Sequence, residues 1–159
     1  MNYSFKTILT ELGELTLISC RNKLIRIYFP QQEINSVYLT NSTANTEPVL
    51  LNATEQLEEY LKGKRRTFAL DLNPEGTLFQ KKVWEELLLI PYGDTISYQE
   101  LALRTGSINK ARAVGYANSR NPLPIIIPCH RVINKNGRLG GYAGGRQIKQ
   151  KLLELERTR

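Results

Sequence analysis

Residue types that can carry out nucleophilic chemistry come together in the segment Pro128-Cys129-His130-Arg131-Val132. A cysteine attacks as its thiolate, and a neighbouring imidazole or cation can lower the thiol pKa from about 8.5. The preceding isoleucines at 125–127 predict a short buried strand, and adjacent side chains of an extended chain point to opposite faces. We therefore expect His130 to act on Cys129 through a bridging water or a local kink. The alternative is that Cys129 only packs in the core, as most free cysteines do.

A histidine that acts as a base also needs an orienting carboxylate, and the sequence offers few nearby. Residues 104–159 contain 12 Lys/Arg but only two acids, Glu154 and Glu156, so we expect one of these two to pair with His130. Residues 1–103, in contrast, contain 10 Lys/Arg and 13 Asp/Glu. Such asymmetry indicates a polyanionic partner for the second part, most commonly nucleic acid. A basic surface that serves only solubility is the alternative.

Two short helices with a tight turn between them are predicted in and just before the basic part. Ser97 and Glu100 fit a capping box for the first helix, which should end at Thr105-Gly106. Asn109 is expected to cap the second helix, over residues 110–119. This pattern is typical of a helix-turn-helix.

The second of these helices combines small and basic residues. They are Lys110, Ala111, Arg112, Ala113 and Gly115, with Arg120 just after the helix. Small residues let a helix backbone approach a DNA groove, and the basic side chains can contact phosphates. The alternative is that the alanines and the glycine serve helix packing inside the core, and the charge asymmetry favours DNA.

A glycine-rich loop follows in the segment Gly140-Gly141-Tyr142-Ala143-Gly144-Gly145. Glycines allow a backbone to approach a flat ligand closely, and Tyr142 would shape the wall of such a site. The segment lacks the lysine and hydroxyl residue of a phosphate-binding loop. A plain turn before the last helix is the alternative.

The remaining elements predict an α/β (α+β) protein of two parts, 1–73 and 74–159. Alternating residues predict antiparallel strands within the first 30 residues, with turns at 12–14 and 21–22. A helix over 48–62, ended by Gly63, and a strand over 66–70 should complete the first part. The second part should begin with a helix that is capped by Thr77 and Gln80 and extends to Ile90 on its apolar face. It should end with a helix over 146–157 that places Ile148, Leu152 and Leu155 inward.

Composition excludes several classes of protein. Of the 159 residues, 41% are hydrophobic and 23% are charged, which argues against disorder. No apolar run is long enough to span a membrane, and the first ten residues do not look like a secretion signal, so we expect a cytoplasmic protein. Two cysteines and a single histidine make a disulfide framework or a zinc site hard to build, so we expect no metal.

Several motifs, in order, resemble the O6-alkylguanine-DNA alkyltransferases, also called methylated-DNA–protein-cysteine methyltransferases. The active-site signature of that family resembles residues 121–132. The resemblance extends to 96–99, 111–115 and 140–145 and covers residues 79–156. The region before it matches only in size, position and expected strands.

By position, the resemblance makes Cys129 the nucleophile, which takes the alkyl group from O6 of guanine in one irreversible transfer without a cofactor. It implies a helper chain of Glu156, His130 and a water. Tyr98 would donate a proton toward the guanine ring as the ring becomes a leaving group. The implied substrate is O6-alkylguanine in DNA, with O4-alkylthymine as a further candidate.

The same resemblance implies how DNA is held. Arg112 would enter the duplex and occupy the space of a flipped nucleotide, because the target atom is inaccessible in a stacked duplex. Asn121 would be the hinge between the helix-turn-helix and the active-site segment. The implied lining of the base pocket is Val132, Gly140, Tyr142, Ala143 and Gly144. The partner would be double-stranded DNA with alkylated bases, bound by a monomer without regard to sequence.

The sequence departs from the family at a few positions. Ala143 stands where some members have a serine beside the base, and Asn118 replaces a larger apolar residue at the pocket rim of some relatives. Some members hold zinc near the N-terminus, which Cys20 alone should not do. Two other classes stay open: a winged-helix DNA-binding regulator with a packed cysteine, and a Cys-His hydrolase.

Overall fold

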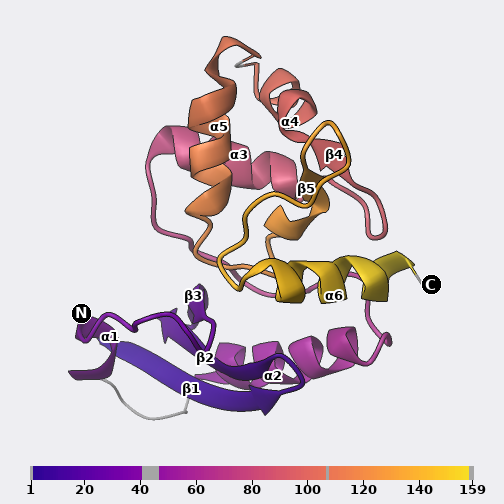
Figure 1. Ribbon diagram of the computed structural model, residues 1–159. Helices are drawn as coiled ribbons and strands as arrows, with labels where there is room; N and C mark the ends of the chain where they lie inside the picture. The colour runs from indigo at the N-terminus through magenta and orange to yellow at the C-terminus, as the bar shows by residue number, and fades with distance from the viewer. Residues whose placement is uncertain (1, 41–46, 107, 158–159) are drawn as a thin grey trace. The chain divides into compact units, whose positions relative to one another are not determined.

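The computed structural model describes residues 2–40, 47–106 and 108–157. The chain forms two compact units, Met1–Pro74 and Glu75–Arg159 (Figure 1). We call the first the sheet unit, because it contains a three-stranded sheet, and the second the helical unit. The predicted α/β class is confirmed. Within the described residues, none of the helices has the length and apolar character that crossing a membrane requires.

An antiparallel sheet forms the first part of the sheet unit, in the order β1 (Tyr3–Thr10), β2 (Gly13–Cys20) and β3 (Lys23–Tyr28). The second hairpin turns at Arg21 and Asn22, whose φ values of 53° and 59° fit a tight two-residue turn. The turn predicted at 21–22 is confirmed. The first hairpin turns slightly earlier than predicted, at residues 11–12, because Gly13 and Glu14 already pair with Thr10 and Leu9 as part of β2.

Helix α2 (Pro48–Leu61) lies against this sheet (Figure 1). Proline at the first helical position suits a helix start, and Gly63, with a φ of 76°, follows its end. The prediction of a helix over 48–62 is confirmed. The segment between β3 and α2 contains a short helix, α1 (Val37–Thr40), and residues 41–46 lie outside the described residues.

The strand predicted over residues 66–70 is wrong. The backbone N–H and C=O of Ala69 pair with the side-chain amide of Gln56 instead of a strand, at 2.8 Å and 3.0 Å. The chain meets β3 slightly later, at an isolated parallel bridge between Leu24 and Leu72. A side chain of α2 therefore satisfies the backbone that a ladder would otherwise satisfy.

The helical unit joins short helices around one small parallel strand pair. Its elements are α3 (Leu78–Leu87), β4 (Ile96–Ser97), α4 (Tyr98–Arg104), the 3-10 turn η1 (Ile108–Lys110), α5 (Ala111–Ser119), the 3-10 turn η2 (Cys129–Arg131), β5 (Val132–Ile133) and α6 (Arg146–Arg157). Strand β4 pairs with β5, so the start of α4 lies beside the segment that follows Cys129.

The predicted caps of the first two helices are present in the helical unit. Thr77 and Gln80 form a complete capping box at α3. At α4 the Ser97 half of the predicted capping box is present, since Ser97 accepts a hydrogen bond from the backbone N–H of Glu100, while the Glu100 carboxylate lies 3.9 Å from Arg104. Helix α3 ends at Leu87, however, and a turn carries the chain to Ile90, which is buried as expected.

Helix α5 begins later than predicted. Lys110 is its N-cap, and no side chain caps the helix, because Asn109 belongs to the preceding turn η1. The buried Trp84 donates its indole N–H to the carbonyl of Ala117 at 2.9 Å, which fixes α5 on α3. The expected pair of helices with a tight turn is thus formed by α4, η1 and α5.

The strand predicted over residues 125–127 is also wrong, although its isoleucines are buried as expected. The N–H of Ile127 returns to the carbonyl of Leu123 at 2.9 Å, and Ile125 has a φ of 75°. Asn121 holds this turn at both ends, because its side chain accepts from the N–H of Leu123 and donates to the carbonyl of Ile127.

Candidate active site

Cys129 and His130 lie in a single 3-10 turn and not in the extended segment that the sequence predicted. The turn is closed by the N–H of Arg131, which donates to the carbonyl of Pro128 at 3.0 Å. All three residues of η2 are buried. The rule that neighbouring side chains of an extended chain face opposite ways therefore does not apply to this turn.

The thiol of Cys129 is 5% exposed, and burial raises its pKa to about 11. A hydrogen bond with the side chain of Asn121 and the charge of Lys149 act in the opposite direction. The thiol is therefore protonated at neutral pH, so attack by its sulfur requires a group that removes the proton.

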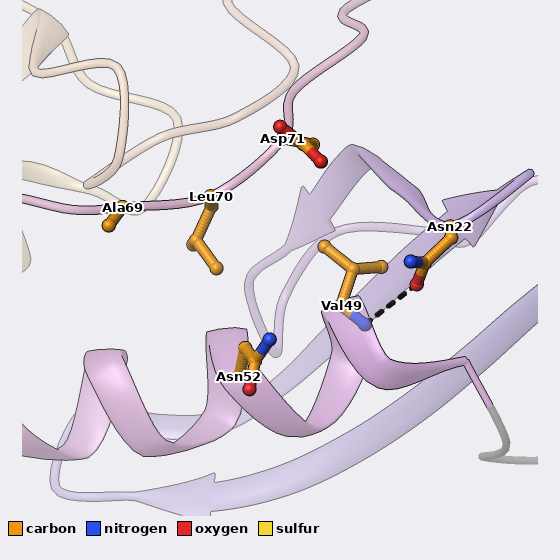
Figure 2. Close-up of a pocket in the computed structure, with 6 residues that line it drawn as sticks. All are labelled: Asn22, Val49, Asn52, Ala69, Leu70 and Asp71. Carbon is orange, nitrogen blue, oxygen red and sulfur yellow. Dashed lines mark hydrogen bonds between the residues drawn. The ribbon is translucent and has the colours of Figure 1, made fainter.

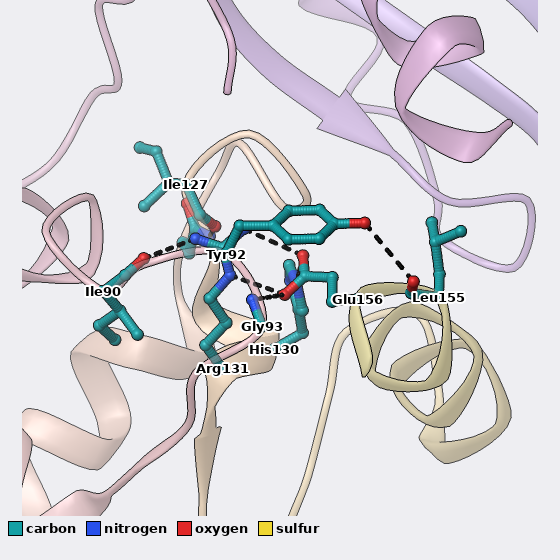
Figure 3. A network of polar contacts seen from close by, with 9 residues as sticks. Ile90, Tyr92, Gly93, Ile127, His130, Arg131, Leu155 and Glu156 are labelled. Carbon is teal, nitrogen blue, oxygen red and sulfur yellow. Dashed lines mark hydrogen bonds and ion pairs between the residues drawn. The ribbon is translucent and has the colours of Figure 1, made fainter. Parts of the chain in front are cut away.

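His130 is fully buried, and its Nε2 lies 2.8 Å from Oε2 of Glu156 on α6 (Figure 3). Burial lowers the pKa of His130, so the ring is neutral at pH 7 and donates its Nε2–H to the carboxylate. Its Nδ1 is then the acceptor, and this atom is buried without a hydrogen-bond partner in the structure. The other acid considered, Glu154, is exposed and bonds to Gln150.

Arg131 was missed by the sequence analysis as a site residue. Its Nε and Nη2 donate to the two carboxylate oxygens of Glu156 at 2.9 Å and 3.0 Å, and its Nη1 donates to the carbonyl of Ile90 at 2.6 Å (Figure 3). The ring of Tyr92 lies 5.7 Å from the guanidinium carbon. Both oxygens of the carboxylate that orients His130 are therefore held in place.

Tyr98 begins α4 and is partly buried between α5 and the glycine-rich loop. A Cβ on Gly115 would lie 3.8 Å from its ring, and one on Gly140 would lie 3.1 Å from its phenol oxygen. Burial raises the pKa of Tyr98, the charge of Cys129 adds to this effect, and a hydrogen bond with Asn118 opposes it. The phenol is thus protonated at neutral pH and close enough to Cys129 to interact with it.

Asn118, noted in the sequence as a departure from the family, therefore lies at the site. Its side chain is 4% exposed and interacts with Tyr98, while its Oδ1 is buried without a hydrogen-bond partner in the structure.

Lys149 on α6 is the second site residue that the sequence analysis missed. The inward face expected for this helix included Ile148 and Leu155, which are only half-buried. The fully or nearly buried residues of α6 are Lys149, Leu152, Leu153 and Glu156. The buried face of α6 therefore differs from the face that its apolar residues predicted. It includes two charged side chains, Lys149 and Glu156, which are buried because they have polar partners.

The residues predicted to hold DNA lie on α5 or at its two ends, and most of them are exposed to solvent. Lys110, Arg112, Ala113 and Arg120 are exposed, while Ala111 and Gly115 are half-buried. The residues predicted to line a base pocket are more varied: Val132 and Gly144 are buried, Gly140 and Tyr142 are half-buried, and Ala143 is exposed. These placements are compatible with the predicted roles, which remain predictions.

A separate cavity of about 350 Å³ lies wholly in the sheet unit (Figure 2). Its lining consists of Asn22, Val49, Asn52, Ala69, Leu70 and Asp71. Asn22 uses its side-chain oxygen to accept a hydrogen bond from the N–H of Val49, at the start of α2. None of the predicted site residues lines this cavity.

Comparison with known proteins gives the same family over both units. The model of the 6-O-methylguanine DNA methyltransferase DNA binding domain matches residues 78–158, and that of the ribonuclease-like domain of the same family matches residues 4–74. A constitutive methylated-DNA–protein-cysteine methyltransferase of Bacillus subtilis is 46% identical over 99% of this chain and 96% of its own. A Mycobacterium bovis protein of the same name is 43% identical over 98% of this chain and 93% of its own.

Solved structures agree with these relatives. The crystal structure of Mycobacterium tuberculosis O6-methylguanine methyltransferase has a TM-score of 0.89 and 41% identity, and it covers 99% of this chain and 94% of its own. The structure of Mycobacterium tuberculosis OGT in complex with DNA has a TM-score of 0.88, 42% identity and the same coverage. The matching family models, the identity over nearly the whole chain and the shared fold lead to one conclusion: this chain belongs to the O6-methylguanine DNA methyltransferase family.

Proposed function

We propose that this protein repairs DNA directly, by moving the alkyl group of O6-alkylguanine to the sulfur of Cys129 in a single irreversible step. The observation that carries the proposal is the buried Cys129 next to a neutral His130 that Glu156 orients at 2.8 Å. Family membership supplies the reaction class, since the named relatives are methylated-DNA–protein-cysteine methyltransferases. All the groups assigned here belong to the domain 74–159, and none belongs to the domain 1–73.

The proton of the thiol has a clear acceptor in this scheme. His130 takes it at Nδ1, through a water, because Nε2 is already engaged with Glu156. The thiolate then forms an S–C bond to the alkyl carbon while the bond from that carbon to O6 breaks. The electron pair of the broken bond stays on guanine, and the resulting thioether is a poor leaving group, so the protein is spent after one transfer.

Tyr98 supplies a proton to the departing base. Its phenol is protonated at neutral pH and interacts with Cys129, so it can donate to a guanine ring nitrogen as negative charge develops there. His130 then passes the proton that it took from Cys129 to Tyr98, so both side chains regain their starting protonation states. The net result is that one proton has moved from sulfur to guanine. No cofactor takes part.

DNA binding in the proposal uses the helix-turn-helix. Arg112 enters the duplex and fills the space of the flipped nucleotide, while Lys110 and Arg120 contact phosphates. The partner is double-stranded DNA of any sequence, bound by a monomer, at an intracellular location that gives access to chromosomal DNA. Affinity for undamaged DNA should then fall steeply with salt and depend little on sequence. A strong preference for one short sequence would favour a regulator instead.

Peptide mass mapping tests the central claim, and the chain contains its own control. We expect a duplex with O6-methylguanine to add one methyl group per protein, on the peptide that contains Cys129. Cys129→Ser should abolish labelling but keep DNA binding, whereas Cys20→Ser should change neither. A methyl group on Cys20, or turnover beyond one equivalent, would defeat the proposal. A duplex with O4-methylthymine, used in the same assay, tests whether this lesion is a second substrate.

A further inference from the structure

Lys149 is a lysine with no exposed surface, which is rare for this residue type unless the charge has partners. Its ammonium donates to three backbone carbonyls: to Val132 at 2.8 Å, to Leu139, and to Gly141 at 3.3 Å. Burying a charged amine is unfavourable because the amine loses its hydration, and hydrogen bonds to three carbonyl groups offset part of this loss. A buried apolar side chain would avoid the cost, so the position of Lys149 calls for an explanation beyond packing.

The three carbonyls belong to segments that border the site. Val132 begins β5, directly after η2, while Leu139 and Gly141 flank Gly140 in the glycine-rich loop. Gly140 has a φ of 73°, and its α-carbon is so close to Tyr98 that an added Cβ would lie 3.1 Å from the phenol oxygen. The ammonium therefore links α6, β5 and the loop that backs Tyr98.

The charge of Lys149 also acts on the nucleophile. It lowers the pKa of Cys129 and that of His130, which are the titratable groups of η2 that interact with it. Burial lowers the pKa of Lys149 to about 8, and the charge of Cys129 acts in the opposite direction. At neutral pH the ammonium is therefore mostly protonated, and a thiolate at Cys129 would strengthen this protonation.

We infer that Lys149 is a positioning residue for alkyl transfer: its ammonium fixes the glycine-rich loop against Tyr98 and holds a positive charge toward the sulfur of Cys129. This inference rests on the proposed function. It assigns to α6 a second task beside that of Glu156, one that none of the expected roles includes.

Two variants and a control separate charge from packing, all in a Cys20→Ser background so that one thiol is observed. Lys149→Met keeps the length of the side chain without charge or donors, and Lys149→Arg keeps the charge. Lys151→Met, at an exposed position of the same helix, is the control. We measure single-turnover methyl transfer from O6-methylguanine duplex, the rate at which a small electrophile alkylates the thiol at pH 7, where Lys149 is still charged, and folding by circular dichroism.

We expect Lys149→Met to fold, with a thiolate fraction at neutral pH about tenfold lower and methyl transfer slower by at least that factor. Lys149→Arg should restore most of both, and Lys151→Met should match the parent. A folded Lys149→Met protein with the parent's rates of methyl transfer and of thiol alkylation at pH 7 would overturn the inference. If the parent transfers no methyl group at all, the proposed function fails, whereas alkylation of the thiol by the small electrophile at pH 7 still tests Lys149.

A second measurement does not depend on whether Lys149→Met folds. The rates of the parent and of Lys149→Arg are compared across pH, because the titration of Cys129 affects both proteins. Arginine stays protonated, whereas Lys149 loses its charge as the pH rises through about 8. The ratio of parent rate to arginine-variant rate should therefore fall over this interval, and a ratio independent of pH would contradict the inference.

Discussion

The two units of this chain bury different kinds of residue. Among the described residues, the buried polar side chains of the sheet unit are Ser4, Thr16 and Ser19, and none carries a charge. The described part of the helical unit buries His130, Arg131, Lys149 and Glu156 beside the thiol of Cys129. The sheet unit thus follows the ordinary pattern of an apolar core, and the helical unit departs from it.

The difference indicates where selection for stability gave way to selection for chemistry. A buried charge pair is often no better for stability than an apolar pair of the same volume, and removing one partner leaves the other uncompensated. Buried charges are nevertheless useful when a nearby group must be held in a defined protonation state. The helical unit keeps such charges around Cys129, and the sheet unit, which holds none of the assigned groups, does without them.

The largest effect is expected from the pair that activates the thiol. We expect His130→Ala to slow methyl transfer by about 10²- to 10⁴-fold, the usual contribution of a general base, and Glu156→Gln to slow it as well, with DNA binding nearly unchanged for both. The double variant should lose less than the sum of the two in free energy, because the residues act as one unit. Single-turnover rates measure this cycle, and fully additive losses would contradict the relay.

Two substitutions test stability in the two units, one at a buried ion pair of the helical unit and one in the apolar core of the sheet unit. Arg131→Met leaves Glu156 buried without its cation, so we expect a loss of about 3–5 kcal/mol in the free energy of unfolding. Leu57→Ala, in the fully buried core of the sheet unit, should cost about 3 kcal/mol through lost contacts and a cavity. Urea unfolding measures both losses.

The two variants should also differ in the chemistry of the thiol. Alkylation of Cys129 by a small electrophile, measured on folded protein, should change in Arg131→Met and stay at the wild-type rate in Leu57→Ala. If both variants altered the thiol equally, the division of tasks between the two units would be wrong.

The sequence was most informative where structure depends on nearby residues. The hairpin at Arg21 and Asn22 and the capping box of Thr77 and Gln80 need contacts only a few residues apart, so their patterns were sufficient. The carboxylate beside His130 was also limited to two candidates, because the second part of the chain contains only two acids.

The failures share a different cause. The isoleucines of 125–127 looked like a strand, but Asn121 ties both ends of that segment into a turn. Nothing in the sequence distinguished Arg131 and Lys149 from the other basic residues of the second part, since long charged side chains are seldom buried. Their partners are a carboxylate and backbone carbonyls distant in sequence, and such partners can be recognised only after the chain has folded.

Arg112 separates the effect of charge from the effect of burial, because it is a charged residue of the helical unit but is exposed. We expect Arg112→Ala to leave the free energy of unfolding nearly unchanged, within about 0.5 kcal/mol. It should slow repair in duplex DNA far more than reaction with free O6-methylguanine base, because only the duplex needs its vacancy filled. Equal loss on both substrates would rule out this role.

The smallest expected effect is a pH dependence of stability that arises from His130. Burial lowers its pKa below 6.5, so the unfolded chain binds a proton more readily than the folded chain, and stability is lost as the pH falls through this range. Between about pH 7.5 and pH 5.5 the loss should reach at most about 1.4 kcal/mol. His130 is the only histidine in the sequence, and carboxylates of ordinary pKa titrate below this interval. Lys149, with a pKa lowered to about 8, also titrates at the upper end of the interval, so the contribution of His130 is the difference in slope between wild type and a variant without this histidine. Urea unfolding of wild type and His130→Asn at both pH values measures it: the wild type should lose stability and the variant should not. An equal slope in both proteins would place the proton uptake elsewhere and remove the argument that the fold keeps His130 neutral, ready to accept the proton of Cys129.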